Sequence, residues 1–278
     1  MFDFAGQDTQ LLLILGAALI GTGIIAGILA GLLGVGGGIV IVPVLYHLLS
    51  YVGIAEDVRM HVAVGTSLAT IIFTSISSSR AHYKKGAIDL RLLKSWGIVI
   101  FIGVLGGTWM ASIVNAQILT GIFAVLALLV AANMAFRPAG SHLADKLPSS
   151  PLKEVLALFI GWFSAMMGIG GGTFSVPILT LFNYPIRQAV GTASAIGLII
   201  AIPGTIGFLA AGLNVTDLPP GNLGYVNLLG FAVIVPMTIV FAPVGAHIAH
   251  TINTDLLKKA FAFFLFLTSL RMFYGIFG

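Results

Sequence analysis

Charged residues are scarce in this chain, and cysteine is absent. Of its 278 residues, 8% are charged and 58% are hydrophobic, and the mean hydropathy is +1.09. Soluble globular domains carry about 25% charged residues, so the composition indicates a polytopic membrane protein. The absence of cysteine excludes disulfides, thiolate metal sites and cysteine nucleophiles. The net charge of +4 does not indicate a nucleic-acid partner, because the basic residues flank apolar segments.

Carboxylates are missing from the apolar segments. All acidic residues fall in expected loops or at helix ends: Asp3, Asp8, Glu56, Asp57, Asp89, Asp145, Glu154, Asp217 and Asp255. A buried Asp or Glu is the usual proton relay of membrane pumps, so this mechanism is disfavoured, as is a site for organic cations. Enzyme motifs are also missing, and GVGGG at 34–38 lacks the continuation of a dinucleotide-binding loop. We predict no catalytic residues, no cofactor and no metal site.

What the chain does contain is one unusual motif, twice. Residues 34–45 read GVGGGIVIVPVL and residues 168–179 read GIGGGTFSVPIL, with seven of twelve positions identical at an offset of 134. The likeness continues as AVGTS at 63–67 and AVGTA at 189–193, at an offset of 126, and towards the end of each half at an offset of 138. Loops of different length account for the changing offset. We interpret the chain as two copies of one unit.

Ten apolar segments are visible, five in each copy. They are Leu11–Leu33, Ile39–Val52, His61–His82, Trp96–Val114 and Ile118–Phe136, then Val155–Gly170, Thr173–Tyr184, Ala189–Ala211, Val226–Ile248 and Ala260–Phe277. A membrane-spanning helix needs about 20 residues, so the short segments after the glycine triplets are predicted to be half-helices. We predict an all-α polytopic membrane protein of two inverted repeats, each a broken-helix hairpin plus three transmembrane helices. The repeats occupy residues 1–136 and 154–278, with a cytoplasmic linker at 137–153.

The basic residues favour the hairpins. If each long and short pair enters and leaves the membrane on one side, eleven of the thirteen Lys and Arg residues face the cytoplasm, as the positive-inside rule requires. The N-terminus then lies in the periplasm, and the two halves insert in opposite directions. The first ten residues lack the basic region of a cleaved signal peptide, so we expect the first span to be retained.

Matched Gly/Pro interruptions in two halves of a membrane protein point to a transporter binding site. The glycines of the two breaks are Gly36, Gly37 and Gly38, and Gly170, Gly171 and Gly172. Glycine can adopt positive φ and permits close approach, and the N-terminus of the short helix that follows each triplet attracts anions. We therefore predict that the two helix ends hold one small anion between them. The alternative is that the glycines only allow tight helix packing.

Hydroxyl side chains follow both breaks. The candidate hydrogen-bond donors to an anion are Thr66, Ser67, Thr173, Thr192 and Ser194. The alternative is that these hydroxyls bond backbone carbonyls one turn earlier in their own helices.

Four further residues are candidates for a transport pathway. Ser78 and Arg80 end a polar run that would line the cytoplasmic mouth, although the run could equally pack against polar neighbours. His47 is placed to titrate on a pathway, with a hydrogen-bonded histidine inside the bundle as the alternative. Arg187 would attract anions at the inner mouth or serve as a positive-inside anchor.

Two copies of G-x-G-G-G-x-x-x-V-P, each followed by a span that opens with A-V-G-T, resemble the sulfite exporter TauE/SafE family of bacterial transporters. The motif residues are Gly34, Gly36, Gly37, Gly38 and Pro43, and Gly168, Gly170, Gly171, Gly172 and Pro177. The likeness covers essentially the whole chain. It implies transport of small sulfur-containing anions, such as sulfite, sulfoacetate or thiosulfate, across the bacterial inner membrane. Thr173 in place of Ile39 is an asymmetry that could affect substrate preference.

The resulting hypothesis is a secondary transporter in the lipid bilayer that rocks one repeat against the other around a small anion. One alternative is a carrier of other small organic anions, such as carboxylates. Another is a non-transporting membrane subunit. Substrate identity, direction, coupling ion and oligomeric state, a homodimer included, stay open.

Overall fold

The computed structural model describes residues 9–136, 143–215, 218, 221–249, 251 and 254–277. The first half contains α1 (Thr9–Leu33), α2 (Gly38–Tyr51), α3 (Glu56–Tyr83), α4 (Leu90–Ile113) and α5 (Ala116–Phe136). The second half contains α6 (Leu152–Met167), α7 (Gly172–Leu181), α8 (Ile186–Gly212), β1 (Asn222–Leu223), β2 (Val226–Asn227), α9 (Leu228–Ile248) and α10 (Thr254–Phe277). The predicted all-α class is confirmed. Residues 1–8 and 137–142, which include part of the predicted linker, lie outside the described residues.

The short helices α2 and α7 begin at the third glycine of each triplet, one residue before the predicted starts at Ile39 and Thr173. They are 14 and 10 residues long, too short to cross a bilayer. Among the described residues, six other helices are long and apolar enough to cross: Leu12–Leu33, Glu56–Tyr83, Leu90–Ile113, Ala116–Phe136, Ile186–Gly212 and Leu228–Ile248. Large apolar side chains are exposed on their outer faces, for example Ile98 and Trp109. Such faces suit contact with lipid, so the chain is a multi-pass membrane protein.

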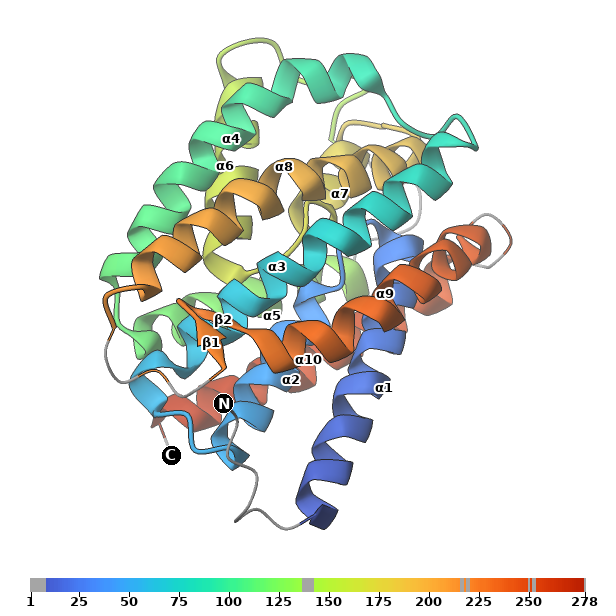
Figure 1. The fold of residues 1–278 in the computed structure, drawn as a ribbon. Coiled ribbons are helices and arrows are strands. Elements are labelled where there is room, and N and C mark those ends of the chain that lie inside the picture. Colours follow the sequence, from blue (N-terminus) through green and yellow to red (C-terminus); the bar gives the residue numbers. More distant parts are fainter. Residues whose placement is uncertain are drawn as a thin grey trace.

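The helices of the two halves are intertwined rather than stacked as separate bodies. Helix α1 packs against α9 of the other half, and α6 packs against α4. Figure 1 shows the α1–α9 pair and the α4–α6 pair on opposite sides, with α3 and α8 across the middle. Exchanging α1–α5 for α6–α10 converts one pair into the other, so the packing repeats the duplication seen in the sequence.

Helices α3 and α8 run antiparallel. The start of α3 lies at the end of α8, where a Cβ on Gly65 would approach Phe208 and Tyr225. The end of α3 lies at the start of α8, where Ser78 Oγ is 3.1 Å from Ser194 Oγ. Because α3 and α8 are equivalent helices of the two copies, their opposite directions are those that inverted repeats require.

Candidate functional site

The two glycine breaks meet at the buried centre of the bundle. The loop between α1 and α2 contacts the loop between α6 and α7 through two backbone hydrogen bonds. Gly172 N–H donates to the Gly34 carbonyl at 3.0 Å, and Gly170 N–H donates to the Val35 carbonyl at 3.1 Å. The two break loops are therefore in direct contact, and their hydrogen bonds join the start of α7 to the end of α1.

The two breaks have different backbone conformations despite their shared motif. In the first break Gly34, Gly36 and Gly37 all have positive φ, with Gly37 at 84°. In the second break the positive φ falls on Gly168, whereas Gly171 is helical at −58°. The expected positive φ thus occurs within the first triplet only.

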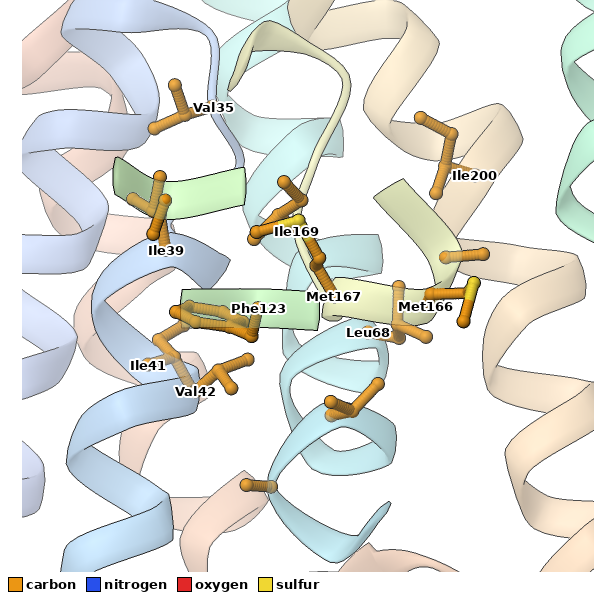
Figure 2. Close-up of a cluster of buried hydrophobic side chains, with 14 of the residues drawn as sticks. Val35, Ile39, Ile41, Val42, Leu68, Phe123, Met166, Met167, Ile169 and Ile200 are labelled. Atoms are coloured by element: carbon orange, nitrogen blue, oxygen red, sulfur yellow. The ribbon is translucent and has the colours of Figure 1, made fainter. Parts of the chain in front are cut away.

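Close packing explains why most of these positions have no side chain. A Cβ on Gly38 would meet the Gly168 carbonyl and lie 2.8 Å from Ser67 Oγ. A Cβ on Gly36 would lie 3.1 Å from the Cα of Gly170. Many apolar side chains also pack around these loops, and Figure 2 shows Val35, Ile39 and Ile169 among them.

Two of the predicted hydroxyls anchor equivalent loops. Thr66 Oγ1 accepts the Asn227 N–H at 2.8 Å, and Thr192 Oγ1 accepts the Asp89 N–H at 2.9 Å. Asn227 caps α9 and Asp89 caps α4 with their side chains. The same interaction therefore occurs twice, each time between the two halves, and it ties α3 to the start of α9 and α8 to the start of α4.

Ser67 and Ser194 also bond backbone carbonyls. Ser67 Oγ donates to the Gly168 carbonyl at 2.6 Å, which joins α3 to the second break. Ser194 Oγ donates to the Val190 carbonyl of its own helix and contacts Ser78 Oγ. Thr173 is 2% exposed and its hydroxyl has no hydrogen-bond partner. Of the five predicted hydroxyls, Thr173 is thus the one without a protein partner.

The remaining pathway candidates lie away from the breaks. His47 is half-buried on α2 and packs edge-on against Tyr46, with ring centres 5.4 Å apart. Arg80 and Arg187 are exposed near the end of α3 and the start of α8. The structure therefore does not gather these three with the glycines. No cluster of three or more His, Cys, Asp or Glu side chains suited to a metal occurs among the residues described.

A contact between Asp89 and Tyr184 joins two loops of different halves and was not anticipated. The Tyr184 hydroxyl donates to Asp89 Oδ2, while Asp89 Oδ1 accepts the N–H groups of Arg91 and Leu92. The hydrogen bond from Tyr184, aided by those two N–H groups, holds the pKa of Asp89 below its usual range. Burial and the hydrogen bond to Asp89 raise the pKa of the Tyr184 hydroxyl. Because neither loop carries a motif, only their proximity in space reveals the pair.

Tyr184→Phe should therefore lower stability in a pH-dependent way. The pKa of Asp89 is lower in the folded state than in the unfolded state. The ionised carboxylate therefore stabilises the folded protein fully above the unfolded pKa of about 4, and this stabilisation is lost as the pH falls through the folded pKa. We expect a loss of about 1 kcal/mol near pH 7, after allowing for solvent screening. The measurement is the melting temperature in detergent from pH 3 to pH 7. A wild-type advantage of equal size at both ends of this range would contradict the assignment.

The fold defines a multi-pass helical membrane protein with paired broken helices. Comparison with known proteins agrees with this class. The family model described as sulfite exporter TauE/SafE matches residues 19–272. The chain therefore belongs to the sulfite exporter TauE/SafE family. No solved structure gives a significant match.

Several relatives are named as probable membrane transporter proteins. One from Haemophilus influenzae is 35% identical over 252 residues, covering 90% of this chain and 95% of the relative. One from Methanocaldococcus jannaschii is 32% identical and covers 81% of this chain and 82% of the relative. YunE from Bacillus subtilis is 27% identical, and the match covers 92% of this chain and 97% of the relative. These names support membership of a transporter family.

Proposed function

We propose that the protein is a secondary transporter that carries small sulfur-containing anions, such as sulfite or sulfoacetate, across the bacterial inner membrane. The observation that carries the proposal is the meeting of two glycine breaks, each followed by a short helix, at the buried centre of a membrane bundle. Broken helices at the interface of two repeats are where secondary transporters bind their substrates. The sulfur chemistry rests on the family.

The intertwined packing suggests which bodies move. Helices α1, α3 and α9 pack together, as do their equivalents α6, α8 and α4. We propose that these two mixed bundles, rather than the sequence halves 1–136 and 154–278, rock against each other. The α3–α8 interface and the two hydrogen bonds between the break loops would then rearrange during the cycle. This replaces the simpler expectation of one repeat moving as a unit.

The proposed orientation places the N-terminus in the periplasm. The orientation rests on the basic residues and on the hairpins, and two groups of loops in the structure support the hairpins. The start of α4 and the end of α7 share one side through Asp89 and Tyr184. The loop before α9 lies by the start of α3, where Tyr225 stacks on His61 with ring centres 5.0 Å apart. Hairpins that return to their side of entry produce this grouping.

Uptake into proteoliposomes tests the proposal. We expect saturable uptake of sulfite or of an organosulfonate above that of protein-free liposomes, with weaker uptake of acetate and chloride. Radiolabelled substrates give the rates, and a second, unlabelled anion tests competition. Uptake of carboxylates alone would overturn the sulfur assignment. Failure of all these anions to enter, with correctly folded protein in the liposomes, would overturn the transport proposal.

A further inference from the structure

The second glycine break differs from the first in the residues that surround it. In the equivalent helices α3 and α8, Ile71 corresponds to Gly197, and Ser75 corresponds to Ala201. On the short helices, Ile39 corresponds to Thr173. The residues beside the second break are Gly197, Ser75 and Thr173. Each of them is smaller or more polar than its counterpart in the other copy, which is Ile71, Ala201 or Ile39.

The Ile71 side chain fills the space beside the first break. A Cβ on Gly36 would lie 3.0 Å from Ile71 Cγ2, and a Cβ on Gly38 would lie 2.8 Å from Ile71 Cδ1. Ile39, which is fully buried, is the second residue of α2. Apolar groups therefore occupy the surroundings where an anion would need hydrogen-bond donors.

Gly197 places no side chain at the equivalent position beside the second break, and Ser75 Oγ packs there instead. The position that a Cβ on Gly197 would take lies 2.5 Å from Ser75 Oγ and 3.6 Å from the backbone nitrogen of Gly171. A hydroxyl from α3 and an amide from the second break thus both lie close to the same position on α8. The backbone hydrogen bonds to the first break use the N–H groups of Gly170 and Gly172, on either side of Gly171.

Two buried hydroxyls at the second break have no partner within the protein. Ser75 is 1% exposed and Thr173 is 2% exposed, and neither hydroxyl makes a hydrogen bond. Buried polar groups are almost always satisfied, so an unsatisfied pair calls for an explanation. Their neighbours on α3, Thr70 and Thr74, each bond a backbone carbonyl of their own helix. Among the described residues, the buried hydroxyls of Thr108, Ser164 and Thr205 also lack a partner. What distinguishes Ser75 and Thr173 is their position beside Gly171 and at the start of α7.

We propose that substrate binds on one side only, at the second break, where Ser75, Thr173 and the Gly171 N–H donate hydrogen bonds to the oxygens of an oxyanion. The inference rests on the proposed function and deepens it by placing the anion. The dipole of α7 adds partial positive charge at the same point. The sequence predicted an anion held between the N-termini of both short helices. The proposed site uses the N-terminus of α7 alone.

The donors also indicate the charge of the substrate. Hydroxyls and amides are neutral, and the cost of burying an ion rises steeply when no opposite charge compensates it. A dianion would therefore be penalised far more than a monoanion. We infer that the site takes a singly charged headgroup, such as a sulfonate or hydrogensulfite, in preference to sulfate.

Binding measurements on the full-length protein in detergent test this site, with methanesulfonate, sulfite and sulfate as probes. We expect Ser75→Ala and Thr173→Val to weaken methanesulfonate binding roughly 10- to 100-fold, the usual range for a hydrogen bond to a charged group. Gly197→Ala should weaken it at least as much, because the added methyl group would clash with Ser75 Oγ and displace that hydroxyl. Wild-type protein should bind sulfate at least about tenfold more weakly than methanesulfonate.

Matched variants control for folding. Thr70→Val removes a buried hydroxyl that bonds its own helix, and Gly204→Ala adds a Cβ that meets a flexible Leu68 methyl at 3.1 Å. Both should leave the dissociation constant within about twofold of wild type, a change of less than 0.5 kcal/mol. Thr173→Ser keeps the hydroxyl and should retain binding. It tests the site even if another variant does not fold.

The outcomes separate the two proposals. If wild type binds and transports sulfonates while Ser75→Ala, Thr173→Val and Gly197→Ala bind them equally well, the one-sided site is wrong and the transport proposal stands. Preference for sulfate over methanesulfonate would overturn the inferred charge. If wild type neither binds nor transports any of these anions, the proposed function fails and the site fails with it. Loss of binding confined to the three site variants would support the inference.

Discussion

Gly172→Ala is expected to reduce anion uptake at least tenfold and to destabilise the protein. A Cβ at this position would meet the carbonyl carbon and oxygen of Gly34 and lie 2.7 Å from the Val35 nitrogen. All three are backbone atoms of the opposite break, so no flexible side chain can move aside. Overpacking a tight site costs about 3 kcal/mol, and here it would force apart the loops joined by the Gly172–Gly34 hydrogen bond.

Uptake into proteoliposomes and the melting temperature in detergent measure the two effects. A loss of about 3 kcal/mol corresponds to a lowering of the melting temperature of roughly 5–10 °C for a chain of this size. Gly16→Ala is the matched control, because a Cβ there has nothing within 4 Å. Equal uptake and equal melting temperature for both variants would show that contact between the breaks is unimportant.

Gly107→Ala and Gly245→Ala are expected to destabilise the protein by similar amounts. These glycines are equivalent in the two copies. A Cβ on Gly107 would meet the Trp162 carbonyl of α6, and a Cβ on Gly245 would meet the Ile28 carbonyl of α1. Each substitution pushes a backbone away and should cost about 1–3 kcal/mol. Because the contacts belong to separate helix pairs, the double variant should show the sum of the two losses.

Melting temperatures of the two single variants and the double variant measure this. Gly21→Ala is the control on α1, since a Cβ there also has nothing within 4 Å. A large loss for one variant and none for the other would contradict the equivalence of the α1–α9 and α4–α6 pairs. A double variant no worse than either single variant would show that the two contacts are coupled.

Hydropathy and the duplicated motif were enough to predict the class of the protein, its ten helices and the two breaks. These properties depend on consecutive residues, because segment length and composition decide whether a helix can cross a bilayer. Glycine triplets similarly end one helix and begin another through local backbone freedom. The predicted start of α7 near Thr173 and the observed start at Gly172 differ by one residue. Thr173 was chosen as a candidate because it begins the second short segment, which is also a local property.

The partners of the candidate residues depended on the tertiary structure. Thr66 and Thr192 turned out to hold the starts of α9 and α4, helices far away in the chain. The repeat pairs Ile71 with Gly197, but the sequence alone does not show that Ser75 Oγ packs against Gly197. Whether a hydroxyl has a hydrogen-bond partner depends on atoms of other helices. Only the folded bundle brings those atoms near. Local patterns therefore defined the breaks, whereas long-range packing decided which of the hydroxyls near them have protein partners.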